Sequence, residues 1–576
     1  MKEYILDIET DGLLDTVTKV HCLVYKTDGL TTVATNKEQI EKALKVLQEG
    51  QIIGHNILGF DLEVLKRLYG FEVPLEQVTD TLILSRLIHA DLRTEDSNVK
   101  RLEPKYFGSH SLKAWGFRLE TLKGDYGSQD NAFEELTPEM IEYCIQDVEL
   151  TDILWENFRS RLPDPNSVWL EHQIANICNR QEYYGINFDE TKAVELYTEL
   201  AGRRDELEEE LKEIFGSWII NEGTRRNELY SKVKIIEFNP NSRQHIAKRL
   251  KELRGWKPKE FTPTGEAKVD ETILSKLKFP EARLMSEYLM VNKRISQLAE
   301  GDQAWLKLIK KGRLHGRINT MGASTSRCSH ATPNIAQVPN TNAPFGKACR
   351  SLFVPDRGQK LLGVDVAGLE LRCLSHYLAL YDGGEYGKKL LDEDIHTVNQ
   401  QAAGLSTRDQ AKTFIYGFLY GAGDQKIGEI VGKGSTEGKK LKSKFLSELP
   451  ALKQLRKAVQ KKSEKGFLRG LDGRRVPVRS KHSALNTLLQ SAGAIICKRW
   501  VVETHKLLNQ EGFKCGQDYS QVAFVHDEIQ LTVKEEYADR IGEICTQAIV
   551  ITGDRYGLRI PLTGEYKVGT NWAETH

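Results

Sequence analysis

The feature that most constrains the fold of this chain is the presence of acidic side chains inside apolar strands. The segment Tyr4–Thr10 has the pattern of a buried strand and carries Asp7 and Glu9 two positions apart. Successive side chains of a strand point to opposite faces, so these two acids share one face. Neighbouring carboxylates repel one another unless a cation lies between them. The strand therefore indicates a site for a hard divalent ion, although such a pattern alone is more often explained by turn or surface acids.

Two later segments strengthen this interpretation. Asn56 and Asp61 follow an apolar segment and precede a helical pattern of leucines. Tyr143 and Asp147 are four positions apart in a helical stretch, which places them on one face of the helix. The spacings D-x-E, N-x(4)-D and Y-x(3)-D, in this order, resemble the three motifs of the DEDDy class of 3′–5′ exonucleases.

That resemblance implies two metal ions held by carboxylates, with Mg²⁺ expected and Mn²⁺ able to substitute. The implied ligands are Asp7, Glu9, Asp61 and Asp147, while Tyr143 orients the attacking water and Asn56 has a supporting role. A purely structural role for these residues is the less favoured alternative.

The charges of the chain are unevenly distributed, although its 576 residues include 81 basic and 81 acidic side chains. Residues 1–150 hold 16 basic against 27 acidic side chains, whereas residues 426–481 hold 17 basic against 5 acidic ones. This separation favours an acidic metal-binding region joined to a region that lies along a polyanion. The alternative is that the lysine-rich helices are only solvated faces. At roughly 100–200 residues per domain, the length predicts about three to five domains.

The nine cysteines occur singly, without a C-x-x-C pair. This predicts reduced thiols in a cytosol-like compartment and argues against a ribbon-type zinc site. We expect neither a signal peptide nor a membrane span, because no apolar core follows a basic start and the apolar run at 492–497 is short. The expected location is the cytoplasm, that of the host cell if the chain is viral.

Residues 160–315 have the character of long charged helices. Two apolar stripes at helical spacing run through them, formed by Leu196, Leu200, Leu207, Leu211 and Ile214 and by Leu284, Tyr288, Val291, Ile295 and Leu298. The two stripes predict an antiparallel pair of long helices, and a plain helical linker domain fits equally well.

The C-terminal half contains a second group of strands that carry acids. The apolar segment Gln359–Val366 holds Asp365 next to its end. Residues 521–525 and 529–533 have the pattern of two strands that flank His526, Asp527 and Glu528. A hairpin would present these residues at its tip, where Asp527 would meet Asp365. Taken alone, acids at such a tip are as often plain turn residues.

The helical segment 408–421 carries Arg408, Lys412, Tyr416 and Tyr420 at intervals of four. Such a series drifts by about 40° per step around a helix, so one face presents two cations and then two aromatic rings. This face matches a nucleoside triphosphate, with cations for the phosphates and a ring for the base and sugar. A solvated basic helix would not need the rings in register.

These motifs are similar to those of family A DNA polymerases, and in particular of the replicative polymerases of T-seven-like bacteriophages. DVAGLELR at 365–372, RDQAKTFIYGFLYGAG at 408–423 and VHDE at 525–528 resemble motifs A, B and C. The resemblance spans nearly the whole chain. It implies an α/β and α+β multidomain fold, with a ribonuclease H-like 3′–5′ exonuclease domain followed by a right-hand polymerase. We expect the exonuclease at 1–165, the thumb with connecting helices at 166–325, the palm at 326–375 and 486–576, and the fingers at 376–485.

The same resemblance implies nucleotidyl transfer with two metal ions. Asp365 and Asp527, with the Val366 carbonyl, would bind two Mg²⁺ ions. His396 and the two cations Arg408 and Lys412 would hold the triphosphate, with Lys412 a candidate general acid.

Further roles follow from the resemblance. Tyr416 would stack near the incoming sugar and Tyr420 near the template base. Glu370 would fill the space of a 2′-hydroxyl and so select dNTPs, and Glu528 would be an auxiliary acid. The residues expected at the primer–template are Arg327, Arg350, Gln490 and His526, together with Tyr420.

The sequence departs from its phage relatives in the thumb. Those relatives carry a long insertion that captures thioredoxin, whereas nineteen residues separate Trp218 from Phe238 here. Thioredoxin is therefore not expected as a partner. Two smaller departures, Ala367 and Ser326, leave the neighbouring Asp365 and Arg327 in place.

The function predicted is a DNA-templated DNA polymerase with a proofreading exonuclease that replicates DNA as a monomer away from membranes. Expected partners are primer–template DNA, dNTPs, a replicative helicase–primase and a single-strand-binding protein. The alternatives are a repair-type polymerase of the same family, an exonuclease whose C-terminal half only binds DNA, and a DNA-binding clamp without enzymatic activity.

Overall fold

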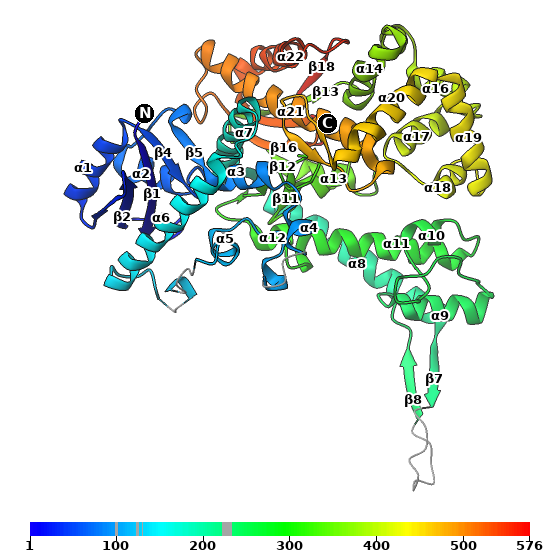
Figure 1. Cartoon of the computed structure of the whole chain (residues 1–576). Helices are drawn as coiled ribbons and strands as arrows, with labels where there is room; N and C mark the ends of the chain where they lie inside the picture. Colours follow the sequence, from blue (N-terminus) through cyan, green and yellow to red (C-terminus); the bar gives the residue numbers. More distant parts are fainter. Residues whose placement is uncertain (98–101, 122–125, 129–130, 222–232) are drawn as a thin grey trace. The chain divides into compact units, whose positions relative to one another are not determined.

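The computed structural model describes residues 1–97, 102–121, 126–128, 131–221 and 233–576. The chain forms two compact units, each assembled from separate stretches of sequence (Figure 1). The first contains Met1–Tyr184, Ile318–His330 and Leu362–Val568, and the second contains Gly185–Arg317, Ala331–Leu361 and Gly569–His576. Within the described part of the chain, no helix combines the length and apolarity that a membrane span requires.

The N-terminal part of the first unit is a five-stranded sheet in the order β3-β2-β1-β4-β5 (Figure 1). Its strands are β1 (Glu3–Thr10), β2 (Val20–Thr27), β3 (Leu30–Ala34), β4 (Gln51–Gly54) and β5 (Val78–Asp80). β1 is antiparallel to β2 and parallel to β4. The helices of this part are α1 (Lys37–Leu47), α2 (Asp61–Tyr69), α3 (Thr81–Ile88), α4 (Leu92–Asp96), α5 (Leu112–Arg118), α6 (Pro138–Arg159) and α7 (Pro165–Tyr184).

The alternation of side chains along β1 decides where its acids point. Leu6 belongs to a core that includes residues of α1 and α2. Ile5 belongs to the opposite core, which includes residues of α6. Asp7 and Glu9 share the parity of Ile5 and therefore lie on the α6 side of the sheet. The expected strand with both acids on one face is confirmed.

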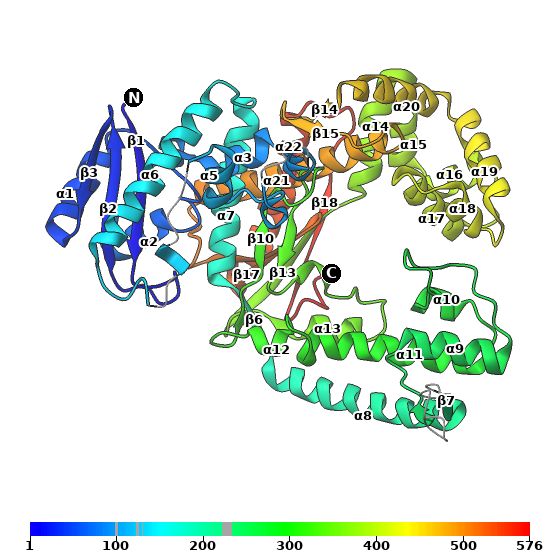
Figure 2. The same cartoon turned by 60° about the horizontal axis from the view of Figure 1, so that its bottom comes forward.

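The C-terminal part of the first unit contains a four-stranded sheet in the order β16-β17-β13-β18 (Figure 2). The strands are β13 (Gln359–Val366), β16 (Tyr519–Val525), β17 (Glu528–Lys534) and β18 (Gly564–Gly569). The long helix α21 (Ala484–Gln510) shares one apolar core with this sheet and with α14 (Leu369–Asp382) and α22 (Ala538–Arg555).

A group of shorter helices positions the predicted triphosphate face. Phe414 and Phe418 on α17 (Arg408–Leu419) contact the ring of Phe445 on α19 (Ser435–Glu448), with centroids 5.1 and 5.3 Å apart. This packing buries one side of α17 and leaves the Arg408 side exposed. The neighbouring elements are α15 (Glu385–Asp392), α16 (Ile395–Ala403), α18 (Asp424–Glu429), α20 (Pro450–Lys462) and the hairpin of β14 (Phe467–Arg469) and β15 (Arg475–Pro477).

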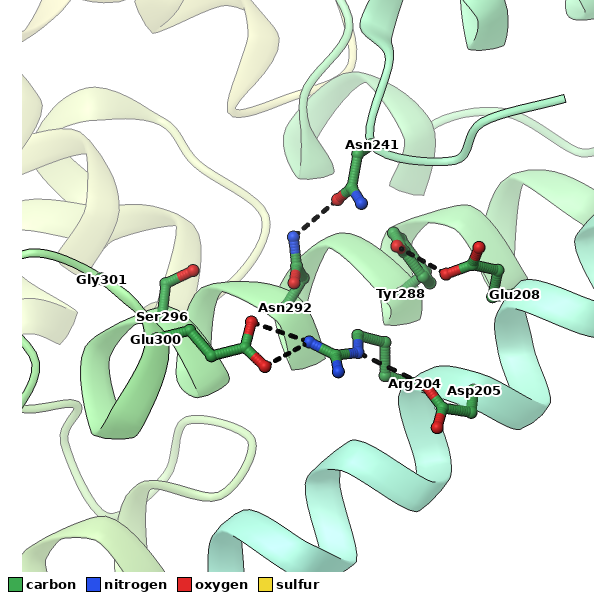
Figure 3. Close-up of a pocket in the computed structure, with 9 residues that line it drawn as sticks. All are labelled: Arg204, Asp205, Glu208, Asn241, Tyr288, Asn292, Ser296, Glu300 and Gly301. Carbon is green, nitrogen blue, oxygen red and sulfur yellow. Dashed lines mark hydrogen bonds and ion pairs between the residues drawn. The ribbon is translucent and has the colours of Figure 1, made fainter. Parts of the chain in front are cut away.

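The second unit is built around the antiparallel helices α8 (Glu190–Phe215) and α11 (Pro280–Ile295), as the two apolar stripes predict. Leu196, Leu200, Leu207 and Leu211 are buried, whereas Phe215 takes the core position expected for Ile214. Polar contacts join the exposed sides of the pair (Figure 3): Arg204 donates to both carboxylate oxygens of Glu300 at 2.8 Å, just after α11.

The remaining elements of the second unit are short. A three-stranded sheet combines β12 (Phe353–Val354), β6 (Ile186–Phe188) and β9 (Arg313–Leu314). Two further strands, β10 (Arg317–Asn319) and β11 (Ser329–Ala331), pair with each other and lie mostly within the Ile318–His330 stretch of the first unit. The helices are α9 (Arg243–Arg254), α10 (Glu271–Ser275), α12 (Trp305–Leu308) and α13 (Gly346–Ser351). Where phage relatives were expected to carry an insertion, β7 (Ser217–Asn221) pairs with β8 (Val233–Glu237), and 222–232 lie outside the described residues.

Candidate functional site

The acids of the N-terminal sheet converge beneath α6. Ligand atoms of Asp7, Glu9 and Cys144 all lie within 4.8 Å of one another. Asp61 lies beside the same strand, because the backbone N–H of Ile8 donates to Asp61 Oδ1 at 3.2 Å. Asp147 comes from α6 and is 5% exposed. The four predicted carboxylates are therefore placed around one strand.

The electrostatics of this cluster favour a bound cation. Burial and, to a smaller extent, the charges of Asp80 and Asp147 raise the pKa of the Asp61 carboxyl to about 8. Carboxylates that are both desolvated and close to like charges are stabilised in their ionised form by a cation. Oxygen donors of this kind fit Mg²⁺ or Mn²⁺. The ring of Tyr143 lies one turn before Asp147, 5.8 Å from the ring of Tyr126.

One residue that sequence reasoning missed holds the loop that leads to Asp61. The buried carboxylate of Asp80 accepts from the backbone N–H of Asn56 at 2.9 Å and of Leu58 at 3.2 Å. Asn56 has a φ of 62°, in the left-handed region that asparagine adopts more readily than most residues other than glycine. The only local signal for Asp80 was its place between an apolar strand and a helix, which also describes an ordinary N-cap.

The second pair of acids lies where β13 ends beside the β16–β17 hairpin. The backbone N–H of Val366 donates to the carbonyl oxygen of Asp527 at 3.1 Å. This bond brings Asp365, which is exposed, next to Asp527, which is half-buried. Burial raises the pKa of the Asp527 carboxyl. The arrangement offers two neighbouring acids, one of which lines a cavity, and carboxylate oxygens suit divalent cations.

The structure corrects the expected position of Glu528. The turn of the hairpin contains only His526 and Asp527, and Glu528 is the first residue of β17, paired with Val525. Its side chain is 7% exposed, and Gln530 Nε2 donates to it at 2.6 Å. Glu528 is therefore part of the strand and not of the hairpin tip, because the turn is one residue shorter than the pattern suggested.

Glu370 is the centre of a polar cluster beside Asp527. Arg327 Nη2 donates to Glu370 Oε1 at 3.2 Å, and the Tyr420 hydroxyl donates to the same oxygen. Burial raises the pKa of the Glu370 carboxyl, and the Asp527 charge adds to the rise. Arg327, Glu370, Tyr420, His526 and Asp527 line one cavity, so five of the predicted site residues meet there.

The cations of α17 gather with His396 at the start of α16. Arg408 pairs with Asp394, the N-cap of α16, with Nη2 and Oδ1 3.2 Å apart, and this pairing lowers the pKa of Asp394 to about 2. Burial, and then the nearby charges of Arg408 and Lys412, lower the pKa of His396. The His396 ring lies 6.3 Å from that of Tyr416. Arg408, His396 and Tyr416 therefore lie near one another where α16 and α17 meet.

Two predicted DNA contacts are not part of these clusters. Gln490 is half-buried on α21. Arg350 belongs to the second unit, where it is 5% exposed, donates through Nε to the Pro339 carbonyl at 3.0 Å and lies over the Trp572 ring at 4.5 Å. Its guanidinium is therefore engaged inside the protein.

Comparison with known proteins assigns the chain to a family. Residues 205–574 match the model of DNA polymerase family A. The chain is 38% identical over 99% of its length to the DNA-directed DNA polymerases of Escherichia phage T7 and Enterobacteria phage T3, covering 99% of each. The solved polymerase domain of Pol1 from M. smegmatis, in complex with DNA primer–template and dNTP, has the same fold. Its TM-score is 0.78 at 18% identity, with 99% of this chain and 96% of that chain covered. The family predicted from the motifs is confirmed: the chain belongs to DNA polymerase family A.

Proposed function

We propose that this DNA-directed DNA polymerase carries two active sites, one for two-metal nucleotidyl transfer at Asp365 and Asp527 and one for 3′–5′ proofreading at the β1 acids. The bond from Val366 N–H to the Asp527 carbonyl carries the first assignment, since it joins the strand end that bears Asp365 to the hairpin turn that bears Asp527. Asp527 lines a cavity together with Glu370, the residue predicted to select dNTPs. Primer extension, described at the end of the Discussion, tests both assignments.

In the polymerase site, Asp365, Asp527 and the Val366 carbonyl would hold Mg²⁺, as members of this family use divalent ions. Bound there, the ions lower the pKa of the primer 3′-hydroxyl and neutralise the triphosphate. The cavity beside these acids would receive the primer terminus, with Arg327 and His526 at its wall.

The triphosphate would bind along α17. Arg408, Lys412 and His396 supply the positive charge, and Lys412 would protonate the departing pyrophosphate. In the structure Arg408 is paired with Asp394, so bound phosphates would compete with this carboxylate for the guanidinium. Tyr416 would lie against the sugar, and Tyr420 near the template base. The α17 helix would therefore act as the moving element that exchanges its contacts when a dNTP binds.

Glu370 would select deoxynucleotides by filling the space that a 2′-hydroxyl needs. Replacing Glu370 with alanine is expected to raise ATP incorporation relative to dATP roughly 10–100-fold, because the excluding carboxylate is removed. Glu370→Gln has nearly the same size and should retain most of the selectivity. Single-nucleotide incorporation with each substrate measures the ratio, and an unchanged ratio in the alanine variant would refute this role.

In the exonuclease site, Asp7, Glu9, Asp61 and Asp147 would hold the divalent ions and Tyr143 would orient the attacking water. The convergence of these acids around β1 supports this proposal. The five-stranded mixed sheet would then be a ribonuclease H-like domain. Asp80 would keep Asp61 in place through the loop that it supports.

Replacing Asp61 with asparagine is expected to slow primer shortening by about 10²–10⁴-fold while leaving primer extension unchanged, because the metal loses a charged ligand. Asparagine keeps an oxygen for the Ile8 N–H, so the fold is preserved. Asp152→Asn is the control, since Asp152 is an acid of the same domain that lies on α6 and pairs with Lys26 at 2.9 Å. Equal shortening rates in both variants would contradict the proposed site.

The partners that we propose are primer–template DNA and dNTPs, with a helicase–primase and a single-strand-binding protein at the replication fork. Arg327, His526, Tyr420 and Gln490 would contact the primer–template, whereas Arg350 would anchor α13 on Trp572. We propose no thioredoxin requirement. The alignment with the phage T7 polymerase spans 702 positions, so that polymerase has more than a hundred positions that this 576-residue chain lacks. We further propose that the protein acts as a monomer in the cytoplasm.

A further inference from the structure

Cys144 lies directly against the β1 acids, in a place where the proposed metal ions would bind. Its Sγ donates to Asp7 Oδ2 at 3.5 Å and to the Asp7 carbonyl at 3.6 Å. The thiol is fully buried, and Glu9 is 9% exposed. Among the described residues, Asp7, Glu9 and Cys144 are the one group of three potential ligands whose donor atoms converge in this way.

This donor set differs in kind from a set of carboxylates alone. Mg²⁺ prefers oxygen ligands and water, whereas Zn²⁺ and Cd²⁺ bind sulfur strongly and accept carboxylates beside it. We infer that Cys144 is a ligand of thiophilic divalent ions at the exonuclease centre, together with Asp7 and Glu9. This inference extends the proposed exonuclease function. Binding of the ion would affect catalysis only if Asp7 and Glu9 belong to the exonuclease site, so that consequence rests on the proposed function. When such an ion binds, the S–H bond is replaced by a sulfur–metal bond and the proton passes to the solvent.

Two consequences follow if a thiophilic ion and Mg²⁺ use the same two carboxylates. A thiophilic ion and Mg²⁺ compete for this centre, since both need Asp7 and Glu9. The Asp365–Asp527 pair is not part of any such sulfur-containing group among the described residues, so the thiophilic ion acts on the exonuclease in preference to the polymerase.

A second thiol nearby allows an alternative metal site, in which two sulfur atoms hold the ion. Cys22 lies on β2 opposite Glu9 and hydrogen-bonds with Cys144. If an ion were held by the two sulfur atoms, the carboxylates would be dispensable. The convergence of the Cys144 sulfur with two carboxylate oxygens favours the mixed site, and the two arrangements predict different behaviour for variants of Cys22.

The test is a titration of the full chain, freed of metal, with Cd²⁺ while the ultraviolet sulfur-to-cadmium charge-transfer absorption is recorded. We expect a saturating absorption that is lost in Cys144→Ser and retained in Cys22→Ser. Cys545→Ser is the matched control, because Cys545 is fully buried in the core of α22, and it should behave as the unaltered chain. Added Mg²⁺ should move the Cd²⁺ midpoint to higher concentration.

Several results would overturn the inference. They are an unchanged absorption in Cys144→Ser, an equal loss in Cys22→Ser, or a midpoint that Mg²⁺ does not move. Hydrogen exchange of the β1 and α6 amides in Cys144→Ser that matches the exchange in the unaltered chain verifies that this variant folds around the site. The absorption does not require nuclease activity, so the two claims fail separately: a chain that binds Cd²⁺ through Cys144 but never shortens a primer would refute the exonuclease alone.

Discussion

Asp527→Asn is expected to reduce primer extension by at least about a thousandfold while primer shortening continues at its normal rate. Asparagine keeps the shape of the side chain and leaves the backbone bond to Val366 intact, but it removes the charge that would hold the metal ions. A metal ion contributes several kcal/mol to transition-state stabilisation in such reactions, and each 1.36 kcal/mol is a factor of ten in rate. Single-turnover incorporation of one dNTP gives the rate directly.

The control for this variant lies on the same hairpin. Asp518 precedes β16 and pairs with Lys534 at 2.7 Å, and Asp518→Asn should extend primers normally. Extension by Asp527→Asn at a rate near that of Asp518→Asn would show that the assigned carboxylate takes no part in catalysis. Loss of shortening together with extension would instead indicate a general folding defect.

The second large effect is expected in a buried ion network that joins three elements of the first unit. Glu171 on α7 accepts from Arg474 Nη1 and from Lys498 Nζ, each at 2.5 Å, and Arg474 also pairs with Asp472. All four side chains are less than 5% exposed. Burial by itself would raise the pKa of Glu171, but the attraction of the two cations outweighs this effect and lowers the pKa.

Glu171→Gln is expected to lower the free energy of local opening by about 3–5 kcal/mol, because it leaves two buried cations with one carboxylate. Hydrogen exchange of the α7 and α21 amides measures this quantity without requiring two-state unfolding. Glu464→Gln is the control: its pair with Lys481 is exposed to solvent, so its loss should leave the exchange of these amides nearly unchanged. Exchange in Glu171→Gln as slow as in this control would contradict the proposed importance of the network.

Much of both sites could be predicted from local pattern. The period of two in β1 places Asp7 and Glu9 together, and the period of four in α17 places Arg408, Lys412 and Tyr416 on one face. These relations depend only on the backbone geometry of a single element. The same holds for the two apolar stripes of α8 and α11.

The rest depends on contacts between segments far apart in the sequence. Neither the Arg408–Asp394 pair nor the stacking of Arg350 on Trp572 leaves a periodic signal. Cys144 stands next to Tyr143 in a motif that had been identified, but its apolar neighbours suggest an ordinary core thiol. Glu528 was misplaced because alternation along a hairpin does not define the length of its turn.

The central claim, two active sites in one chain, is tested most directly with a 5′-labelled primer on a longer template in the presence of Mg²⁺ and without thioredoxin. With four dNTPs the primer should lengthen, and without them it should shorten. Long products from single binding events would support the proposal that no thioredoxin is required. A primer that shortens in both reactions would contradict the assignment of the polymerase site, and a primer that lengthens with dNTPs but never shortens would contradict the exonuclease.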